Sequence, residues 1–392
     1  MNSPAQHPYD QLTPDRVLDA VESLGYISDA RILTLNSYEN RVYQIGIEEE
    51  DPVIAKFYRP GRWSREQIEE EHEFTLELQA MEFPVVAPIK SAPIKSAPIE
   101  SAPIKSAPIK SAPIKSAPIK SAPIKSAPIK SAPIKSAPIK SAPMKVAPEA
   151  NNEGKTLHEF NGFLFALFPR QGGHAPELDN LDNLLILGRT LGRIHKLGAA
   201  KEFTYRPEIN LQRYGIDSVE FLLENDFIPA ALHEAYETLV RDLLHRLQRI
   251  EQQHTWQSIR VHGDCHIGNI LWRNNAPHFV DFDDTSMAPA IQDLWMLLSG
   301  DRQEQTLQMA EILEGYTEFM DFHPSELNLV EYFRTLRLLH YSGWLAKRWH
   351  DPAFPRAFTW FNTERYWAEH ILELREQLAA LDEPPLAIFG QL

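Results

Sequence analysis

Cysteine is nearly absent from this sequence: Cys265 is the only one among 392 residues. A single cysteine cannot form an intramolecular disulfide, and no Cys/His spacing indicates a zinc site. The first residues lack the basic start and apolar stretch of a secretory signal, and the apolar run 163–168 is far too short to cross a bilayer. These absences predict a cytoplasmic protein without a membrane partner.

Basic residues are scarce outside one segment. Residues 87–146 carry eleven lysines and one glutamate, whereas the other 332 residues carry 28 basic and 53 acidic side chains, a net charge of −25. An acidic surface repels the phosphate backbone, so we expect no nucleic-acid partner.

The lysine-rich segment is a tandem repeat of twelve pentapeptides, most of them Ala-Pro-Ile-Lys-Ser. Proline at every fifth position blocks helices and central strands, and one apolar residue in five buries too little surface to offset chain entropy. We predict a disordered or polyproline-like spacer, with a β-solenoid as the alternative. The repeat lies between a predicted helix and a predicted strand, where a short loop would suffice.

The remaining sequence divides into a strand-rich part and a helix-rich part. Strand-like runs cover 31–35, 41–47, 52–58 and 163–168, and Ser64 with Gln67 forms a capping box that begins a helix. Beyond Pro169 the apolar spacing is mostly helical. Helices are predicted over 181–197, 229–252, 290–298, 305–319, 325–349 and 363–380. The pattern predicts an α+β chain with two lobes, 1–168 and 169–392, and a ligand cleft between them.

The strongest chemical signal is the stretch His262-Gly263-Asp264, with Asn269 five residues after the aspartate and Asp281 twelve residues later. Phosphoryl transfer from a nucleotide needs a carboxylate that orients the attacking hydroxyl and oxygen ligands for Mg²⁺. We predict Asp264 as the catalytic base and Asn269 and Asp281 as the metal ligands. The role of Asp283 stays open at this point.

Further nucleotide contacts are predicted in the first lobe. Lys56 lies in a strand with apolar neighbours on both sides, where its ammonium would hold the α- and β-phosphates. A lysine in this role pairs with a helix glutamate, and the spacing to Phe74 and Leu78 favours Glu71 among its acidic neighbours. The loop 36–40 has no glycine, and Ser37 is its candidate phosphate contact.

The motifs around Asp264, Asn269 and Asp281, with the run Leu191–His195, resemble the aminoglycoside-phosphotransferase and choline-kinase-like branch of the protein kinase-like fold. The runs 35–43, 56–60, 289–298 and 351–355 further resemble bacterial stress response protein kinases, over nearly the whole chain outside the repeat. The resemblance implies a bilobal fold and a cytoplasmic, ATP- and Mg²⁺-dependent Ser/Thr protein kinase. It also implies that Ser37 contacts ATP; we further expect a monomer.

Two other functions remain open from the residues alone. A small-molecule kinase acting on an amino alcohol, sugar or aminoglycoside hydroxyl would share the same ATP-handling residues, and the acidic surplus would suit a cationic acceptor. A metal-dependent phosphoesterase also uses Gly-Asp fragments, but it needs more His and Asp ligands than the motif supplies, and Lys56 would have no role in it.

Overall fold

The computed structural model of this chain describes residues 9–91 and 154–388. Its smaller lobe is built on five antiparallel strands: β1 (Ser28–Leu35), β2 (Arg41–Ile47), β3 (Val53–Phe57), β4 (His158–Phe160) and β5 (Phe163–Pro169). The strand order is β1-β2-β3-β5-β4. Lys56 in central β3 lies opposite Val42 of β2 and Ala166 of β5. The predicted antiparallel sheet lobe is therefore confirmed.

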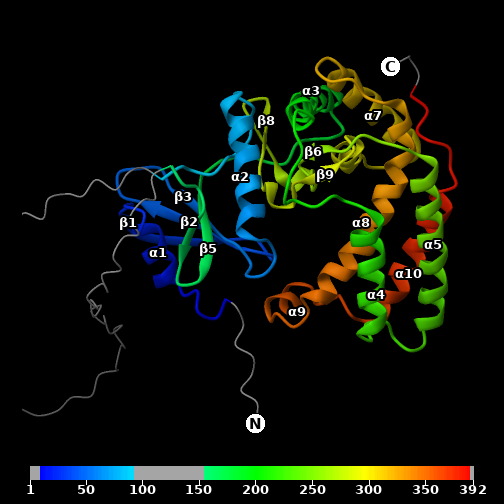
Figure 1. Cartoon of the computed structure of the whole chain (residues 1–392), viewed down its shortest axis with the longest axis horizontal. Helices are drawn as coiled ribbons and strands as arrows, with labels where there is room; N and C mark the ends of the chain where they lie inside the picture. The colour runs from blue at the N-terminus through cyan, green and yellow to red at the C-terminus, as the bar shows by residue number, and fades with distance from the viewer. Residues whose placement is uncertain (1–8, 92–153, 389–392) are drawn as a thin grey trace, which may run out of the picture.

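Two helices accompany this sheet. α1 (Pro14–Glu22) begins after the N-cap Thr13 and packs its apolar face into the core of the small lobe. α2 (Arg65–Ala80) begins with the predicted capping box of Ser64 and Gln67. Phe74 and Leu78 of α2 belong to the core of the larger lobe, so this helix joins the two lobes. Figure 1 shows α2 standing between the sheet and the helical part of the molecule.

The larger lobe is mainly helical. Its longer helices are α3 (Leu181–Gly198), α4 (Asp217–Glu224), α5 (His233–Gln253), α7 (Arg302–Thr317), α8 (Val330–Lys347) and α10 (Glu364–Ala380). Short strands β6 (Ile259–Val261), β7 (Ile270–Arg273), β8 (Ala276–Phe279) and β9 (Ser286–Ala288) lie on its inner side, next to α2 (Figure 1). β6 pairs with β9 and β7 with β8, both antiparallel. Within the described residues, no helix is both long and apolar enough to span a membrane.

Several helix predictions differ from the structure. The helix expected over 290–298 is only α6 (Ile291–Leu294) followed by a 3₁₀ turn, Trp295–Leu297, and that expected over 325–349 begins at α8 after the 3₁₀ segment Pro324–Leu329. The carboxylate of Glu326 accepts the backbone N–H of Ile291 at 3.0 Å, so the 3₁₀ segment before α8 is tied to the start of α6. Tertiary contacts here override local spacing. α4 and the short α9 (Ala353–Ala357) were not predicted.

The first repeat unit, residues 87–91, is part of the small lobe, so the prediction of disorder is wrong for it. Ala87 and Ser91 are buried, and the backbone N–H of Ile89 donates to the carbonyl of Leu167 at 2.7 Å. The N–H of Ser91 donates to Lys155 at 2.8 Å, and the N–H of Gly154 donates back to Ser91 at 3.0 Å. The two ends of the insertion therefore meet at the edge of the fold. The rest of the repeat lies outside the described residues.

Candidate functional site

A pocket of about 400 Å³ lies between the lobes. Its walls are the loop between β1 and β2, the segments 263–269 and 281–284, and one face of α8. Four of the predicted residues line it, namely Ser37, Asp264, Asn269 and Asp281. Ser37 and Asp281 are far apart in the sequence, and nothing in the sequence indicates that they lie at the same pocket. The fold brings them together.

The loop that carries Asp264 is fixed by a buried carboxylate. Gly263 follows β6 with φ +85°, and a Cβ there would lie 2.1 Å from the carbonyl oxygen of Asp284, so only glycine fits. Asp293, fully buried, accepts the backbone N–H groups of His262 at 2.7 Å and Gly263 at 2.9 Å. His195 contacts the same carboxylate at 3.0 Å. The two sequence runs that contain His195 and Asp293 thus serve to hold the loop.

Asp264 is held between a histidine and an arginine. The N–H of Gly268 donates to Nδ1 of His266 at 3.0 Å, which leaves Nε2 as the donor that faces Asp264 at 3.3 Å. Arg337 of α8 contacts the other carboxylate oxygen at 2.5 Å. Burial alone would raise the pKa of Asp264, but the hydrogen bond from His266 and the charge of Arg337 bring this pKa well below its usual range. The carboxylate is therefore ionised at neutral pH.

The two predicted metal ligands flank Asp264. The amide group of Asn269 donates to the backbone carbonyl of Asp264 at 2.9 Å, and no hydrogen bond to its amide oxygen is found among the described residues. Asp281 has left-handed backbone angles, φ 59° and ψ 63°, and its side chain is 53% exposed. This combination turns an accessible carboxylate into the pocket at the cost of a sparsely populated backbone conformation.

Lys56 lies at the centre of a group of carboxylates. Its Nζ is 3.0 Å from Asp281, 3.1 Å from Asp283 and 3.6 Å from Glu71. Burial would lower the pKa of Lys56, but these three carboxylates raise it well above its ordinary value. Glu71, selected from the spacing of α2, is thus the partner within reach. It is also held by Arg206 at 2.9 Å.

The position of α2 follows from its packing on the motif itself. Phe282, between Asp281 and Asp283, is buried, and its ring lies edge-on to Phe74 of α2 with centroids 6.1 Å apart. Phe74 is one turn after Glu71. The apolar contact therefore fixes the distance between Glu71 and the carboxylates that surround Lys56.

Sequence reasoning missed the arginines of the small lobe. Arg62 forms ion pairs with Asp283 and Asp284, and its Nε lies 3.7 Å from Glu39. With Arg62 and Lys56 beside it, Asp283 has a pKa well below its usual range in spite of its burial. These contacts join residues 221 and 222 positions apart. Only the position of Arg62 shortly after the Lys56 strand hinted at them.

A second missed contact closes the pocket on the side of α8. Glu39, in the loop that carries Ser37, lies 2.5 Å from Nε of Arg348 and accepts a hydrogen bond from Nε1 of Trp344 at 2.6 Å. Nearby, Arg59 contacts Asp351 at 2.5 Å. The runs 56–60 and 351–355, which both resemble the stress response kinases, therefore meet across the lobes.

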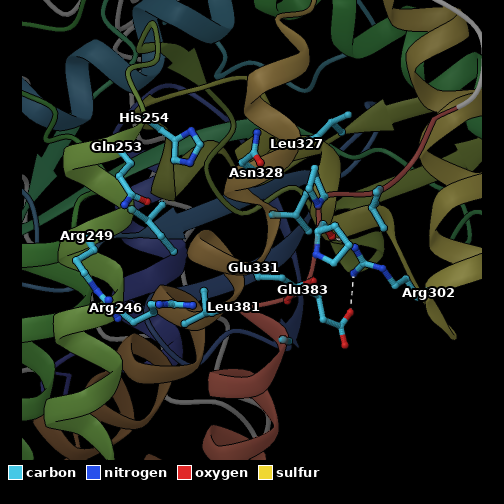
Figure 2. A pocket seen from close by; sticks show the side chains of 16 residues that line it. Arg246, Arg249, Gln253, His254, Arg302, Leu327, Asn328, Glu331, Leu381 and Glu383 are labelled. Atoms are coloured by element: carbon cyan, nitrogen blue, oxygen red, sulfur yellow. Dashed lines mark hydrogen bonds and ion pairs between the residues drawn. The ribbon is translucent and has the colours of Figure 1, made fainter.

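Another pocket, of about 190 Å³, lies between α5, α7 and the segment after α10 (Figure 2). Two of its arginines are paired: Arg302 lies 2.9 Å from Glu383, and Arg246 forms an ion pair with Asp382. None of the predicted site residues lines it. The pocket between the lobes is therefore the candidate active site.

The donor set of this pocket fits Mg²⁺ held together with a nucleotide. No group of three His, Cys, Asp or Glu side chains in the described ranges forms a metal cage of its own. Asn269 and Asp281 instead offer one neutral and one charged oxygen, which suits an ion that binds through one or two carboxylates and substrate phosphates.

Comparison with known proteins gives one consistent result. The model of the family described as "Phosphotransferase enzyme family" matches residues 31–97 and 142–330. The chain is 37% identical over 380 residues to stress response kinase A of Escherichia coli O157:H7, covering 97% of each chain. It is 36% identical, with the same coverage, to the serine/threonine protein kinase RdoA of Salmonella typhimurium strain LT2.

Solved structures agree on the fold. An amicoumacin kinase in complex with AMP-PNP, Ca²⁺ and its ligand superimposes with a TM-score of 0.64 at 17% identity, covering 97% of this chain and 96% of the other. A microcompartment-associated aminopropanol kinase gives 0.60 at 14% identity, with coverage of 93% and 98%. The bilobal kinase-like architecture predicted from sequence is thereby confirmed. The chain belongs to the phosphotransferase enzyme family and is a relative of the bacterial stress response kinases.

Proposed function

We propose that this protein is an ATP- and Mg²⁺-dependent Ser/Thr protein kinase that acts in a bacterial stress response. The observation that carries the proposal is that Asp264 and Asp281 line one pocket between the lobes, with Lys56 directly behind Asp281 at 3.0 Å. The identity of 36–37% to kinases with that name and role supports the choice of acceptor and context. We further propose a cytoplasmic monomer.

In the proposed reaction, Asp264 accepts the proton of a Ser or Thr hydroxyl as the oxygen attacks the γ-phosphorus of ATP. The bond from this phosphorus to the bridging oxygen breaks, and ADP leaves with that electron pair. Lys56 holds the α- and β-phosphates, and Ser37 contacts the phosphates from the covering loop. Asn269 and Asp281 would hold Mg²⁺, which neutralises charge on the phosphates when bound.

The carboxylates that line the pocket speak against a cationic acceptor. There are five of them, and each is paired with a cation of the chain: Glu39, Asp264, Asp281, Asp283 and Asp284. A site for an aminoglycoside or amino alcohol needs a free carboxylate for the ammonium group. Although the sequence has an excess of acidic residues, the described residues of the pocket offer no unpaired carboxylate to a cationic acceptor. This disfavours the small-molecule alternative.

The mouth of the pocket suits a polypeptide. Tyr38 and Tyr341 line it and are 41% and 39% exposed, and Trp360, 44% exposed, stacks on Tyr341 with centroids 6.5 Å apart. Exposed aromatic side chains gathered at one place mark an interaction surface. A small acceptor would leave this surface uncovered.

The test is a direct comparison of acceptors. Purified protein is incubated with labelled ATP and Mg²⁺, first with dephosphorylated casein and then with a panel of amino alcohols, sugars and aminoglycosides. We expect label in casein, at Ser or Thr by mass spectrometry, and none with the Asp264→Asn variant. Label in a small molecule and in no protein would refute the proposal.

A further inference from the structure

The arginine beside the catalytic loop has donors to spare. Arg337 lines the pocket and uses Nη1 to contact Asp264, and its side chain is 40% exposed. A guanidinium carries five N–H groups in a planar fork, and no other hydrogen bond from Arg337 is found within the described residues. Such a fork binds a carboxylate or phosphate through two parallel hydrogen bonds. The free part of this side chain thus lies next to Asp264, where the proposed reaction places the acceptor hydroxyl.

The surroundings of Arg337 carry positive charge. One turn later on α8, His340 stacks on Tyr214 with ring centroids 4.1 Å apart, and both line the pocket. Burial and the charges of Arg213, Lys347, Arg348 and Arg62 lower the pKa of His340 to about 3. Four cations therefore lie close to His340 on this side of the pocket, and His340 itself is neutral at physiological pH.

Arg213 adds a donor that lacks an acceptor. Its Nη1 is buried and has no hydrogen-bond partner among the described residues, and its guanidinium lies 5.8 Å from the Tyr214 ring. Buried polar groups without a partner are uncommon and call for an explanation. We take Arg213 as a source of positive electrostatic potential behind Tyr214. Arg337 is the group that contacts the ligand.

We propose that Arg337 is a specificity-determining residue that binds an anionic side chain near the acceptor hydroxyl, so that the preferred substrates are Ser or Thr residues close to an acidic or phosphorylated residue. The inference rests on the proposed protein kinase activity. When the anion binds the free N–H groups, Arg337 still contacts Asp264, so one guanidinium sets both the base and the neighbouring residue of the substrate.

The experiment uses the full chain and a peptide array. Each peptide carries one acceptor Ser, and Glu, phosphoserine, Gln or Lys is placed in turn at the four positions on either side. We expect kcat/KM to be about 10- to 100-fold higher with the anionic residue than with Gln at one or two positions, the range expected for a hydrogen bond to a charged group. The Glu and phosphoserine arms tell a carboxylate from a phosphate ligand.

Variants separate this role from a purely structural one. In Arg337→Gln the ratio of kcat/KM for the anionic peptide to kcat/KM for the Gln peptide should fall to about one. Arg337→Lys should keep part of this preference, because lysine keeps the charge but lacks the planar guanidinium. The matched control Arg365→Gln, at an arginine 86% exposed on α10, should keep the full ratio. Melting curves of each variant check that it is folded.

The outcomes are distinct. If Arg337→Gln slows every peptide equally and the preference persists, Arg337 only positions Asp264 and the inference is wrong. Peptides phosphorylated with no anionic preference in the parent would also overturn it while leaving the kinase activity intact. If no peptide or protein is phosphorylated but a small molecule is, the proposed function itself fails, and this inference with it.

Discussion

The ammonium of Lys56 lies 3.0 Å from the carboxylate of Asp281, although 225 positions separate them in the chain. The contact joins strand β3 of the small lobe to the segment after β8 in the large lobe. Both groups are proposed to bind the ATP–Mg²⁺ complex. Before the nucleotide binds, the ion pair holds both side chains in place and compensates the charge of each. The same ion pair also ties the two lobes together.

Lys56→Met should therefore affect both catalysis and stability. Loss of one positioned cation at the phosphates is expected to lower kcat about 10²–10³-fold. The free energy of unfolding should fall by about 1–3 kcal/mol, because Asp283 and Glu71 lose a buried partner but keep Arg62 and Arg206. Steady-state kinetics and urea denaturation measure the two effects. Lys196→Met, on the exposed side of α3, is the control; a Lys56 variant with normal turnover would contradict the assignment.

Asp264→Asn should abolish phosphoryl transfer while ATP binding is preserved. Removal of one general base costs on the order of 10²–10⁴ in rate, whereas Lys56 and Asp281 remain in place for the nucleotide. Single-turnover transfer and calorimetric ATP binding report the two properties separately. Near-normal turnover in this variant would mean that another group accepts the proton.

The rate should not fall on the acid side of neutrality through protonation of Asp264. The pKa of this carboxyl lies well below its usual value near 3.8, so it stays ionised down to about pH 5. Arg337→Gln removes a charge that lowers this pKa, so the pKa rises and the acid limb of kcat/KM should move to higher pH. Because this limb lies below about pH 5, profiles of parent and variant between about pH 3 and 7 test the shift, and identical acid limbs would count against the contact.

Asp281→Ala should weaken ATP binding only when Mg²⁺ is present. Asp281 offers the charged oxygen of the proposed metal site, and its side chain is accessible in the pocket. Titration of ATP at saturating Mg²⁺ and again in EDTA separates the metal contribution. Equal affinity of parent and variant at saturating metal would remove Asp281 from the site. Asn269→Ala should show the same pattern with a smaller loss, because a neutral ligand is removed.

Much of this site was predictable from sequence because its chemistry is local. The spacing from Asp264 to Asn269 depends on one loop, and the choice of Glu71 depends on the period of α2, which one helix fixes. The antiparallel lobe followed from short alternating runs. These features depend on residues that are near one another in the chain.

The arginine contacts were not predictable for the opposite reason. Arg62 meets Asp283 and Asp284, and Arg337 meets Asp264, only after the lobes have assembled. From the sequence alone, an arginine on a helix or loop cannot be distinguished from an ordinary exposed cation. The early end of α6 and the late start of α8 have the same cause, since contacts between distant segments, such as Glu326 with Ile291, decide these boundaries.

Cys265→Ser should keep activity and keep whatever peroxide sensitivity the parent has. The thiol is fully buried, and burial together with the nearby carboxylates of Asp293 and Asp264 raises its pKa well above the ordinary value. A thiol without thiolate character reacts slowly, which favours a structural role for Cys265. Activity after graded peroxide treatment is the measurement, with Cys265→Ala as the second variant. If either variant became resistant to peroxide, Cys265 would have a redox role.

Deletion of residues 92–146 should leave ATP turnover nearly unchanged and thermal stability unchanged or slightly raised. The ladder between Ser91 and Gly154–Lys155 already closes the insertion, and the seven residues 147–153 left behind are enough for a surface loop. Shortening the loop about ninefold lowers the entropic cost of closing it, which favours the folded state by about 2 kcal/mol. Melting temperatures of parent and deletion variant are compared at low and high salt. The deleted segment contains ten of the repeat's eleven lysines, and docking of these on the acidic body would be screened above physiological ionic strength. A melting temperature that falls by more than a few degrees on deletion, or a salt dependence seen only in the parent, would show that the repeat contributes to the folded state.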